Sequence, residues 1–306
     1  MLDLPLIIAG PTASGKSILA MTLAEELGGA LICADSRQFY AGMVVGTAGP
    51  SQEEQIKIPH YLFHAQDPKF PLDVSGFLKR ADSAVEKCKT QNQHPILVGG
   101  TGLYLRSWRF GIDDAPPSDP EVRQLLEERL RQEGVLALHR ELMQNDPVRA
   151  QKIHPNDPVR VVRALEIQQL TLKLPSALLP GNFENKEIRR WGHHILLWPS
   201  LEWLRPRVEA RAEKMLNKEL IKEALALRQG LPKDSRLINT MGYEEAFLLH
   251  EAQLSRELAL RQMIKRQWAF ARRQRTWFKK ETWWHVYPAE APNLMEQILK
   301  DVSQIS

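Results

Sequence analysis

The stretch GPTASGKS at residues 10–17 constrains the fold more than any other part of the sequence. It fits the phosphate-loop pattern G-x-x-x-x-G-K-[ST], in which a strand precedes the loop and a helix follows it. Here LPLIIAG precedes it as an apolar run, and an apolar-periodic stretch follows over 18–27. We therefore expect a loop that holds a diphosphate or triphosphate through its amides and the helix N-terminus. The expected diphosphate-binding residues are Gly10, Thr12, Ala13, Ser14, Gly15, Lys16 and Ser17, with Ser17 also as the ligand of Mg²⁺.

Strand and helix signals alternate in the first hundred residues. ALICADS and HPILVGG read as short buried strands, and VSGFLKRADSAVEKCKT reads as a helix between them. Short apolar runs joined by helices predict a parallel sheet that is covered on both faces. The expected fold class is therefore α/β, with a phosphate-loop, nucleotide-kinase-like parallel sheet as its core.

The pattern changes at DDAPPSDP, where prolines interrupt any regular element. Helical patterns follow to about residue 190, and Ser118 with Glu121 predicts a capping box for the first of these helices. HHILLWPS and TWWHVY then read as strands, with a helix through LRPRVEARAEKML after the first. We expect a core domain from 1–115 and 191–306 and an all-helical insertion domain at 116–190.

Positive charge is concentrated near the C-terminus. The chain has a net charge of +4, but residues 256–280 hold nine Lys or Arg and a single acidic residue, Glu257. Trp268, Phe270, Trp277 and Phe278 are interleaved with these cations. A solvated helix usually mixes charges of both signs, so we favour contact with a nucleic acid over a plain solvated face.

Composition excludes several other classes of protein. Two cysteines, Cys33 and Cys88, are too few for a disulfide framework or a cysteine zinc site. The N-terminal run lacks the basic flank and the cleavage site of a signal peptide, and it is too short to span a membrane. We expect a cytoplasmic protein that has no membrane partner and is a monomer.

Acidic residues at strand ends are scarce. An NTPase needs a carboxylate there to hold Mg²⁺ or to orient water, and only Asp35, near the end of ALICADS, is a candidate. The other central strand, PILVGG, is followed by Thr101, which can cap a helix or donate a hydrogen bond to a phosphate or bridging oxygen. This pattern weakens the case for a nucleotide kinase or for an RNA-binding NTPase that acts as a switch.

Six stretches in one order carry a family resemblance. They are GPTASGKS, DSRQFYAGMVVGTAGP, ILVGGTGLYL, HPNDPVRVVRALE, RVEARAEKML and RQRTWF. Together, from about residue 6 to 280, they resemble the bacterial tRNA dimethylallyltransferases of the IPP transferase family. The resemblance implies transfer of a dimethylallyl group from dimethylallyl diphosphate to N6 of the adenine at tRNA position 37. Diphosphate would be the leaving group and Mg²⁺ the cofactor.

The resemblance also implies roles for individual residues. Asp35 would accept the proton of the adenine amine, Thr101 would contact the bridging oxygen, and Arg211 would hold the diphosphate, with Arg207 as the second candidate. Ser36 and Gln38 would read the adenine edge, and helical-insertion arginines would contact the anticodon stem-loop. The full set of expected tRNA-binding residues is Asp35, Ser36, Arg37, Gln38, Thr101, Arg123, Arg160, Arg163, Arg272 and Arg273.

The sequence departs from the family pattern in three places. Gly49 replaces a basic residue, Glu219 replaces a glycine, and Trp268 with Ala269 replaces Arg-Gln. Gly49 and Trp268 put individual tRNA contacts in question, but none of the three touches the loop, Asp35 or Thr101. The main alternative is an adenylate isopentenyltransferase that acts on free AMP, ADP or ATP, and a less favoured one is a nucleotide kinase-like NTPase.

Overall fold

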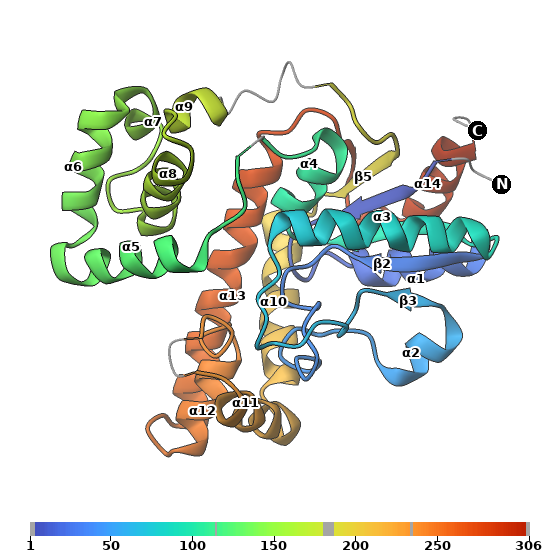
Figure 1. Ribbon diagram of the computed structural model, residues 1–306. Coiled ribbons are helices and arrows are strands. Elements are labelled where there is room, and N and C mark those ends of the chain that lie inside the picture. Colours follow the sequence, from blue (N-terminus) through green and yellow to red (C-terminus); the bar gives the residue numbers. More distant parts are fainter. Residues whose placement is uncertain (1–3, 114, 180–186, 233–234, 304–306) are drawn as a thin grey trace. The chain divides into compact units, whose positions relative to one another are not determined.

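A computed structural model describes residues 4–113, 115–179, 187–232 and 235–303. It divides the chain into two compact units, which are described separately (Figure 1). The first, called the core unit, comprises Met1–Arg109 and Arg189–Ser306. The second, called the helical unit, is Phe110–Ile188 and interrupts the core unit in sequence.

The core unit contains a six-stranded sheet in which every described pairing is parallel. Its order is β3-β2-β4-β1-β5-β6. The strands are β1 (Leu6–Ala9), β2 (Gly29–Cys33), β3 (His60–Tyr61), β4 (His94–Gly99), β5 (His193–Leu197) and β6 (His285–Tyr287). The predicted parallel α/β sheet is confirmed, and β5 and β6 show that the chain returns to this sheet after the helical unit.

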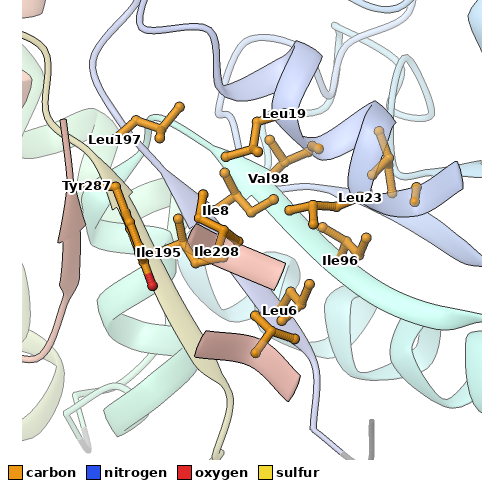
Figure 2. Close-up of a cluster of buried hydrophobic side chains, with 14 of the residues drawn as sticks. Leu6, Ile8, Leu19, Leu23, Ile96, Val98, Ile195, Leu197, Tyr287 and Ile298 are labelled. Atoms are coloured by element: carbon orange, nitrogen blue, oxygen red, sulfur yellow. The ribbon is translucent and has the colours of Figure 1, made fainter. Parts of the chain in front are cut away.

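Helices cover both faces of the sheet. For this reason β1, β2, β4 and β5 are buried along their whole length. On one face, side chains from α1 and α14 pack against Ile8, Ile96 and Ile195 (Figure 2).

The helices of the core unit are α1 (Lys16–Leu27), α2 (Gln52–Lys57), α3 (Val74–Thr90), α4 (Gly102–Phe110), α10 (Leu201–Met215), α11 (Lys218–Gly230), α12 (Tyr243–His250), α13 (Arg256–Phe278) and α14 (Leu294–Ser303).

The helical unit has its own apolar core, in which Leu126, Leu138 and Leu165 are fully enclosed. Its helices are α5 (Pro120–Glu133), α6 (Val135–Asn145), α7 (Pro147–Gln151), α8 (Pro158–Thr171) and α9 (Pro175–Leu178). The short helices α7 and α9 were not anticipated, because four or five residues carry no readable periodicity.

The predicted capping box at the start of α5 is wrong. Asp119 is the N-cap, and its side chain accepts hydrogen bonds from the backbone N–H of Glu121 and Val122 at 3.0 Å each. Pro120 occupies the first helical position, where its missing N–H costs nothing. Ser118 therefore lies one residue outside the helix, and its hydroxyl donates to the carboxylate of Glu166 instead.

A buried ion network ties the helical unit together around Glu166. This carboxylate is fully enclosed and accepts hydrogen bonds from Arg163 Nη1 at 2.7 Å and Arg123 Nη1 at 3.2 Å. Burial alone would raise the pKa of Glu166, but the hydrogen bonds from Ser118 and Arg163, with the two guanidinium charges, hold it below its usual range. Glu166 therefore remains ionised and joins α5 to α8.

We expect Glu166→Ala to lower the free energy of unfolding by about 2–3 kcal/mol, because it leaves two guanidinium groups without their shared anion. Urea denaturation followed by circular dichroism would measure the change. Glu127→Ala is the matched control, since it removes an exposed partner of Arg123 and should change stability by less than about 0.5 kcal/mol. Equal losses in the two variants would contradict the structural role of Glu166.

Candidate active site

The phosphate loop connects β1 to α1 and is shaped by two glycines. Gly15 precedes α1 with a φ of +88°, in the left-handed region that favours glycine. A Cβ on Gly10 would lie 2.6 Å from Ser14 Oγ and 3.1 Å from the carbonyl oxygen of Leu197. The backbone therefore closes into the compact turn that presents amides and the helix N-terminus to an anion.

Two side chains of this loop are placed for an anion. Ser14 is 1% exposed, and its hydroxyl is among the buried polar atoms without a partner in the described chain. The Lys16 ammonium lies 3.4 Å from the carbonyl oxygen of Pro11. Burial lowers the pKa of Lys16 to about 8, with the positive charge of Arg211 acting in the same direction and Asp35 opposing it.

Asp35 and Thr101 follow neighbouring strands of the sheet, β2 and β4, so both lie at its carboxyl edge. Thr101 Oγ1 accepts a hydrogen bond from the backbone N–H of Ser36 at 2.9 Å. Asp35 Oδ1 accepts from the N–H of Arg37 at 2.9 Å. The hydroxyl proton of Thr101 and the second oxygen of Asp35 are not used by these two bonds.

A cavity of about 460 Å³ opens beside the phosphate loop. Asp35 is the single acidic residue among the described residues that line it, and the cations are Lys16, Arg37, Arg211, Arg266 and Arg273. The walls also include apolar side chains such as Phe270. Arg266 is paired with Glu244 and Glu245, but the other four cations still outnumber Asp35, and this imbalance of charge favours a polyanionic ligand. Of the predicted site residues, the cavity brings together Thr12, Lys16, Ser17, Asp35, Ser36, Arg37, Gln38, Arg211 and Arg273.

The two candidate diphosphate arginines on α10 have different environments. Arg211 lines the cavity, donates from Nη2 to the carbonyl oxygen of Thr47 at 3.1 Å and leaves its buried Nε without a partner in the described chain. Burial lowers the pKa of Arg211. Arg207 does not line the cavity, and its guanidinium stacks 4.1 Å above the Trp203 ring. The geometry favours Arg211.

The remaining predicted residues lie outside this cavity. Thr101 does not line it, although its hydroxyl is bonded to Ser36, which does. Arg272 is exposed on α13 and lies in shallower grooves beside the cavity. In the helical unit, Arg160 is 68% exposed, with Asp157 3.5 Å away. Arg123 and Arg163 are both engaged by Glu166, as described above.

Sequence reasoning missed the residue that joins the catalytic loops. Gln274 on α13 is 6% exposed; its Oε1 accepts from the N–H of Thr12 at 2.8 Å, and its Nε2 donates to the carbonyl oxygen of Gly100 at 2.9 Å. It therefore connects the phosphate loop with the segment that carries Thr101. A lone glutamine in a basic helix gave no signal of this role, because both partners are more than 170 residues away in sequence.

The positions that depart from the family pattern have distinct surroundings. A Cβ on Gly49 would lie 2.2 Å from Nε2 of His64, so an imidazole fills the space above this glycine. Trp268 packs against Leu204 and Val208 in a small apolar cluster. Glu219 is exposed and pairs with Lys222 at 2.9 Å. Gly49, Glu219 and Trp268 do not line the cavity, whereas Ala269, which follows Trp268, does.

No group of three or more His, Cys, Asp or Glu side chains in the described ranges is arranged to hold a metal ion. Among the helices that the structure describes, none is long and apolar enough to cross a membrane.

The parallel sheet, the strand order and the loop at the end of β1 define a phosphate-loop α/β protein with a cationic cavity. A model of the family described as IPP transferase matches residues 38–281. The chain belongs to the IPP transferase family.

Similar proteins are known in sequence and in structure. The tRNA dimethylallyltransferase of Geobacter metallireducens is 38% identical, with 96% of each chain covered. The counterpart of Thermus thermophilus is 34% identical, covering 90% of this chain and 89% of its own. The crystal structure of a tRNA isopentenylpyrophosphate transferase from Bacillus halodurans is 30% identical with a TM-score of 0.69, over 99% of this chain and 95% of that one. A eukaryotic dimethylallyltransferase acting on tRNA gives a TM-score of 0.79 at 25% identity, over 98% and 78%.

We expect the affinity for inorganic diphosphate to fall as the pH rises through about 8, because Lys16 loses its proton there. Above that pH the affinity should fall by up to about tenfold per pH unit. Isothermal titration calorimetry between about pH 7 and about pH 9.5 would measure this slope. The control is Lys16→Arg, whose guanidinium keeps its charge, so that its affinity should show only the titration of the diphosphate itself. Identical slopes in both proteins would contradict the assignment.

Proposed function

We propose that the chain transfers a dimethylallyl group from dimethylallyl diphosphate to N6 of the adenine at tRNA position 37, releasing diphosphate. The observation that carries this proposal is the cavity whose described lining combines a single carboxylate, Asp35, with the phosphate-loop residues Lys16 and Ser17. The tRNA dimethylallyltransferases that the chain resembles over nearly their full length support it.

The leaving group explains the excess of cations. When the allylic carbon–oxygen bond breaks, negative charge develops on the departing diphosphate, and preorganised donors stabilise that charge most strongly in the transition state. Lys16 and Arg211 bring full positive charges to the cavity, and the Ser14 hydroxyl has no competing partner among the described residues. Thr101 would donate its hydroxyl proton to the bridging oxygen while accepting from Ser36.

The acceptor is an adenine amine, which is a poor nucleophile because its lone pair is delocalised. Asp35 would accept the N6 proton as the new carbon–nitrogen bond forms. Gln38 is held with its Nε2 donating to the carbonyl oxygens of Thr47 and Ala48, at 3.1 Å each. These bonds occupy the NH₂ group and leave the amide oxygen as an acceptor. That oxygen could accept a hydrogen bond from the second N6 proton of adenine.

Magnesium fits the residues present. Ser17 and Asp35 both line the cavity, and a hydroxyl or one carboxylate is the usual protein contribution to Mg²⁺, with phosphate and water oxygens completing its octahedron. Bound Mg²⁺ would neutralise charge on the diphosphate, and we propose Ser17 as its protein ligand.

We further propose that the tRNA contacts α13 and the helical unit. Arg272 and Arg273 are exposed, form no ion pair among the described residues and lie beside or in the cavity. Arg160 is the best-placed of the three predicted arginines of the helical unit, since Arg123 and Arg163 are committed to Glu166. Phosphate contacts of this kind would offset the cost of extruding a base from the loop, which is on the order of a few kcal/mol.

A transfer assay tests the function directly. The protein is incubated with labelled dimethylallyl diphosphate and Mg²⁺, and tRNA, AMP or ATP is offered separately. Label on tRNA alone supports the proposal, and analysis of the digested tRNA locates the modified adenine. Label on AMP or ATP would favour an adenylate isopentenyltransferase. Hydrolysis of ATP without any transfer would contradict both assignments.

We expect Asp35→Asn and Thr101→Ala each to lower kcat by about 10²–10³-fold, by the loss of one group that acts in the transition state. Steady-state kinetics with tRNA at saturating diphosphate substrate would measure this. Asp67→Asn is the matched control, because Asp67 Oδ1 accepts from the N–H two residues later, as Asp35 does, but lies outside the cavity. Near-normal kcat in both site variants would refute their assigned roles.

Replacing Arg272 and Arg273 by Gln should weaken tRNA binding at every salt concentration. The slope of log K against log salt should become shallower by about two, roughly one for each arginine that no longer neutralises a phosphate. Filter binding across a salt series would measure it. Arg261→Gln controls for a general loss of charge on α13, since Arg261 is 71% exposed and paired with Glu257. An unchanged slope in the double variant would show that the two arginines are merely solvated.

A further inference from the structure

One carboxylate outside the cavity holds the backbone of a loop that lines it. Glu223, on α11, accepts hydrogen bonds from three consecutive N–H groups, those of Val44, Val45 and Gly46, at 3.0 Å each. The hydroxyl of Tyr243, at the start of α12, donates to the same carboxylate at 2.5 Å. Glu223 Oε1 and Oε2 therefore receive two donors each, which fills the acceptor capacity of an ionised carboxylate.

The next residue of this loop, Thr47, connects it to two side chains of the cavity. The carbonyl oxygen of Thr47 accepts from Arg211 Nη2 at 3.1 Å and from Gln38 Nε2 at 3.1 Å. Both Gly46 and Thr47 line the cavity. A shift of the backbone held by Glu223 would therefore move the anchor of the diphosphate arginine and of the glutamine that faces the adenine.

Packing fixes the loop from the other side. Gly46 lies so close to the ring of Tyr243 that a Cβ there would be 2.4 Å from a ring carbon. Tyr243 is 2% exposed, and burial raises its pKa, with the charge and hydrogen bond of Glu223 adding to the effect. The tyrosine thus stays protonated and donates. The segment before it contributes Asn239, Thr240 and Met241 to the cavity wall.

Successive backbone N–H groups that converge on one point form a binding site for an anion. In this loop the anion is internal, so the three amides are occupied and the loop is held in one arrangement. A neutral amide at position 223 could not replace it, because its oxygen offers half the acceptor sites and its NH₂ group would oppose an N–H. The charge of Glu223 is therefore essential to this arrangement, beyond its size.

We propose that Glu223 is a positioning residue for the transfer reaction, acting through the Val44–Thr47 backbone on Arg211 and Gln38. This inference rests on the proposed function. Its effect should fall on kcat, because the groups it orients act on charge and protons that develop as the bonds change. A role limited to stability would instead lower the folded fraction and leave the activity per folded molecule unchanged.

The test replaces Glu223 by Gln in the full chain. Glu223→Gln should lower kcat by about 10- to 100-fold, the range expected when reacting groups are displaced by about 1 Å. The KM for tRNA should change by less than about threefold, since the exposed arginines of α13 are untouched. Hydrogen–deuterium exchange should accelerate in the peptide covering residues 43–49, whereas the phosphate-loop peptide should keep its rate.

Two other variants complete the design. Glu219→Gln lies one turn earlier on α11, where the exposed side chain pairs with Lys222, and it should leave kcat and exchange unchanged. Tyr243→Phe keeps the ring against Gly46 and removes one donor to Glu223, so it should lower kcat in the same direction by less. If Glu223→Gln does not fold, Tyr243→Phe decides the question.

The outcomes separate this inference from the function on which it rests. Transfer by the unaltered protein with a normal kcat in Glu223→Gln overturns the positioning role and leaves the function intact. Faster exchange over residues 43–49 without any loss of kcat also overturns it, because the loop would then be anchored by Glu223 but irrelevant to the reaction. No transfer by the unaltered protein is a failure of the proposed function itself.

Discussion

The site depends most on the two hydrogen bonds of Gln274. They attach α13 to the phosphate loop through Thr12 and to the end of β4 through Gly100. Such a close approach requires small residues: a Cβ on Gly100 would lie 2.3 Å from Nε2 of Gln274, and a Cβ on Gly102 would lie 2.2 Å from the Trp277 ring. A neutral amide suits this place, because it donates and accepts at once and adds no charge to a cavity already rich in cations. The helix that displays Arg273 is thus the same element that sets the spacing of the catalytic loops.

The buried cations of the cavity bear on how a diphosphate would bind. Lys16, Arg37, Arg211 and Arg273 share the described lining with one carboxylate. Burial is the main cause of the lowered pKa values of Lys16 and Arg211, and the charge of Arg211 adds to the effect on Lys16. Dimethylallyl diphosphate would relieve the cost of this burial when it binds. Part of the affinity for the diphosphate would then come from offsetting the cost of burying these cations, as expected of sites that stabilise developing charge without reorganising.

Local sequence patterns were sufficient to predict the parallel sheet and its main helices. The phosphate loop, the buried strands and the long helices are each encoded within about twenty residues, and parallel strands place Asp35 and Thr101 at one edge. Partners distant in sequence could not be read. Arg123 and Arg163 look like surface arginines until Glu166 is seen between them, and the anchors Glu223 and Gln274 look like ordinary polar residues of amphipathic helices. The capping error at Ser118 has a local origin instead, since the adjacent Asp119, directly before Pro120, is the N-cap.

The phosphate loop alone is compatible with breaking either a phosphorus–oxygen or a carbon–oxygen bond. Hydrolysis of a triphosphate needs a carboxylate or an amide that orients water, together with an acidic ligand for Mg²⁺. The lining offers one carboxylate for both tasks, and the neighbouring strand ends in a threonine. Departure of a whole diphosphate needs no attacking water at phosphorus, so Asp35 is available to the adenine amine. The scarcity of acidic groups therefore argues against an NTPase and agrees with the proposed role of Asp35 toward the nucleophile of a prenyl transferase.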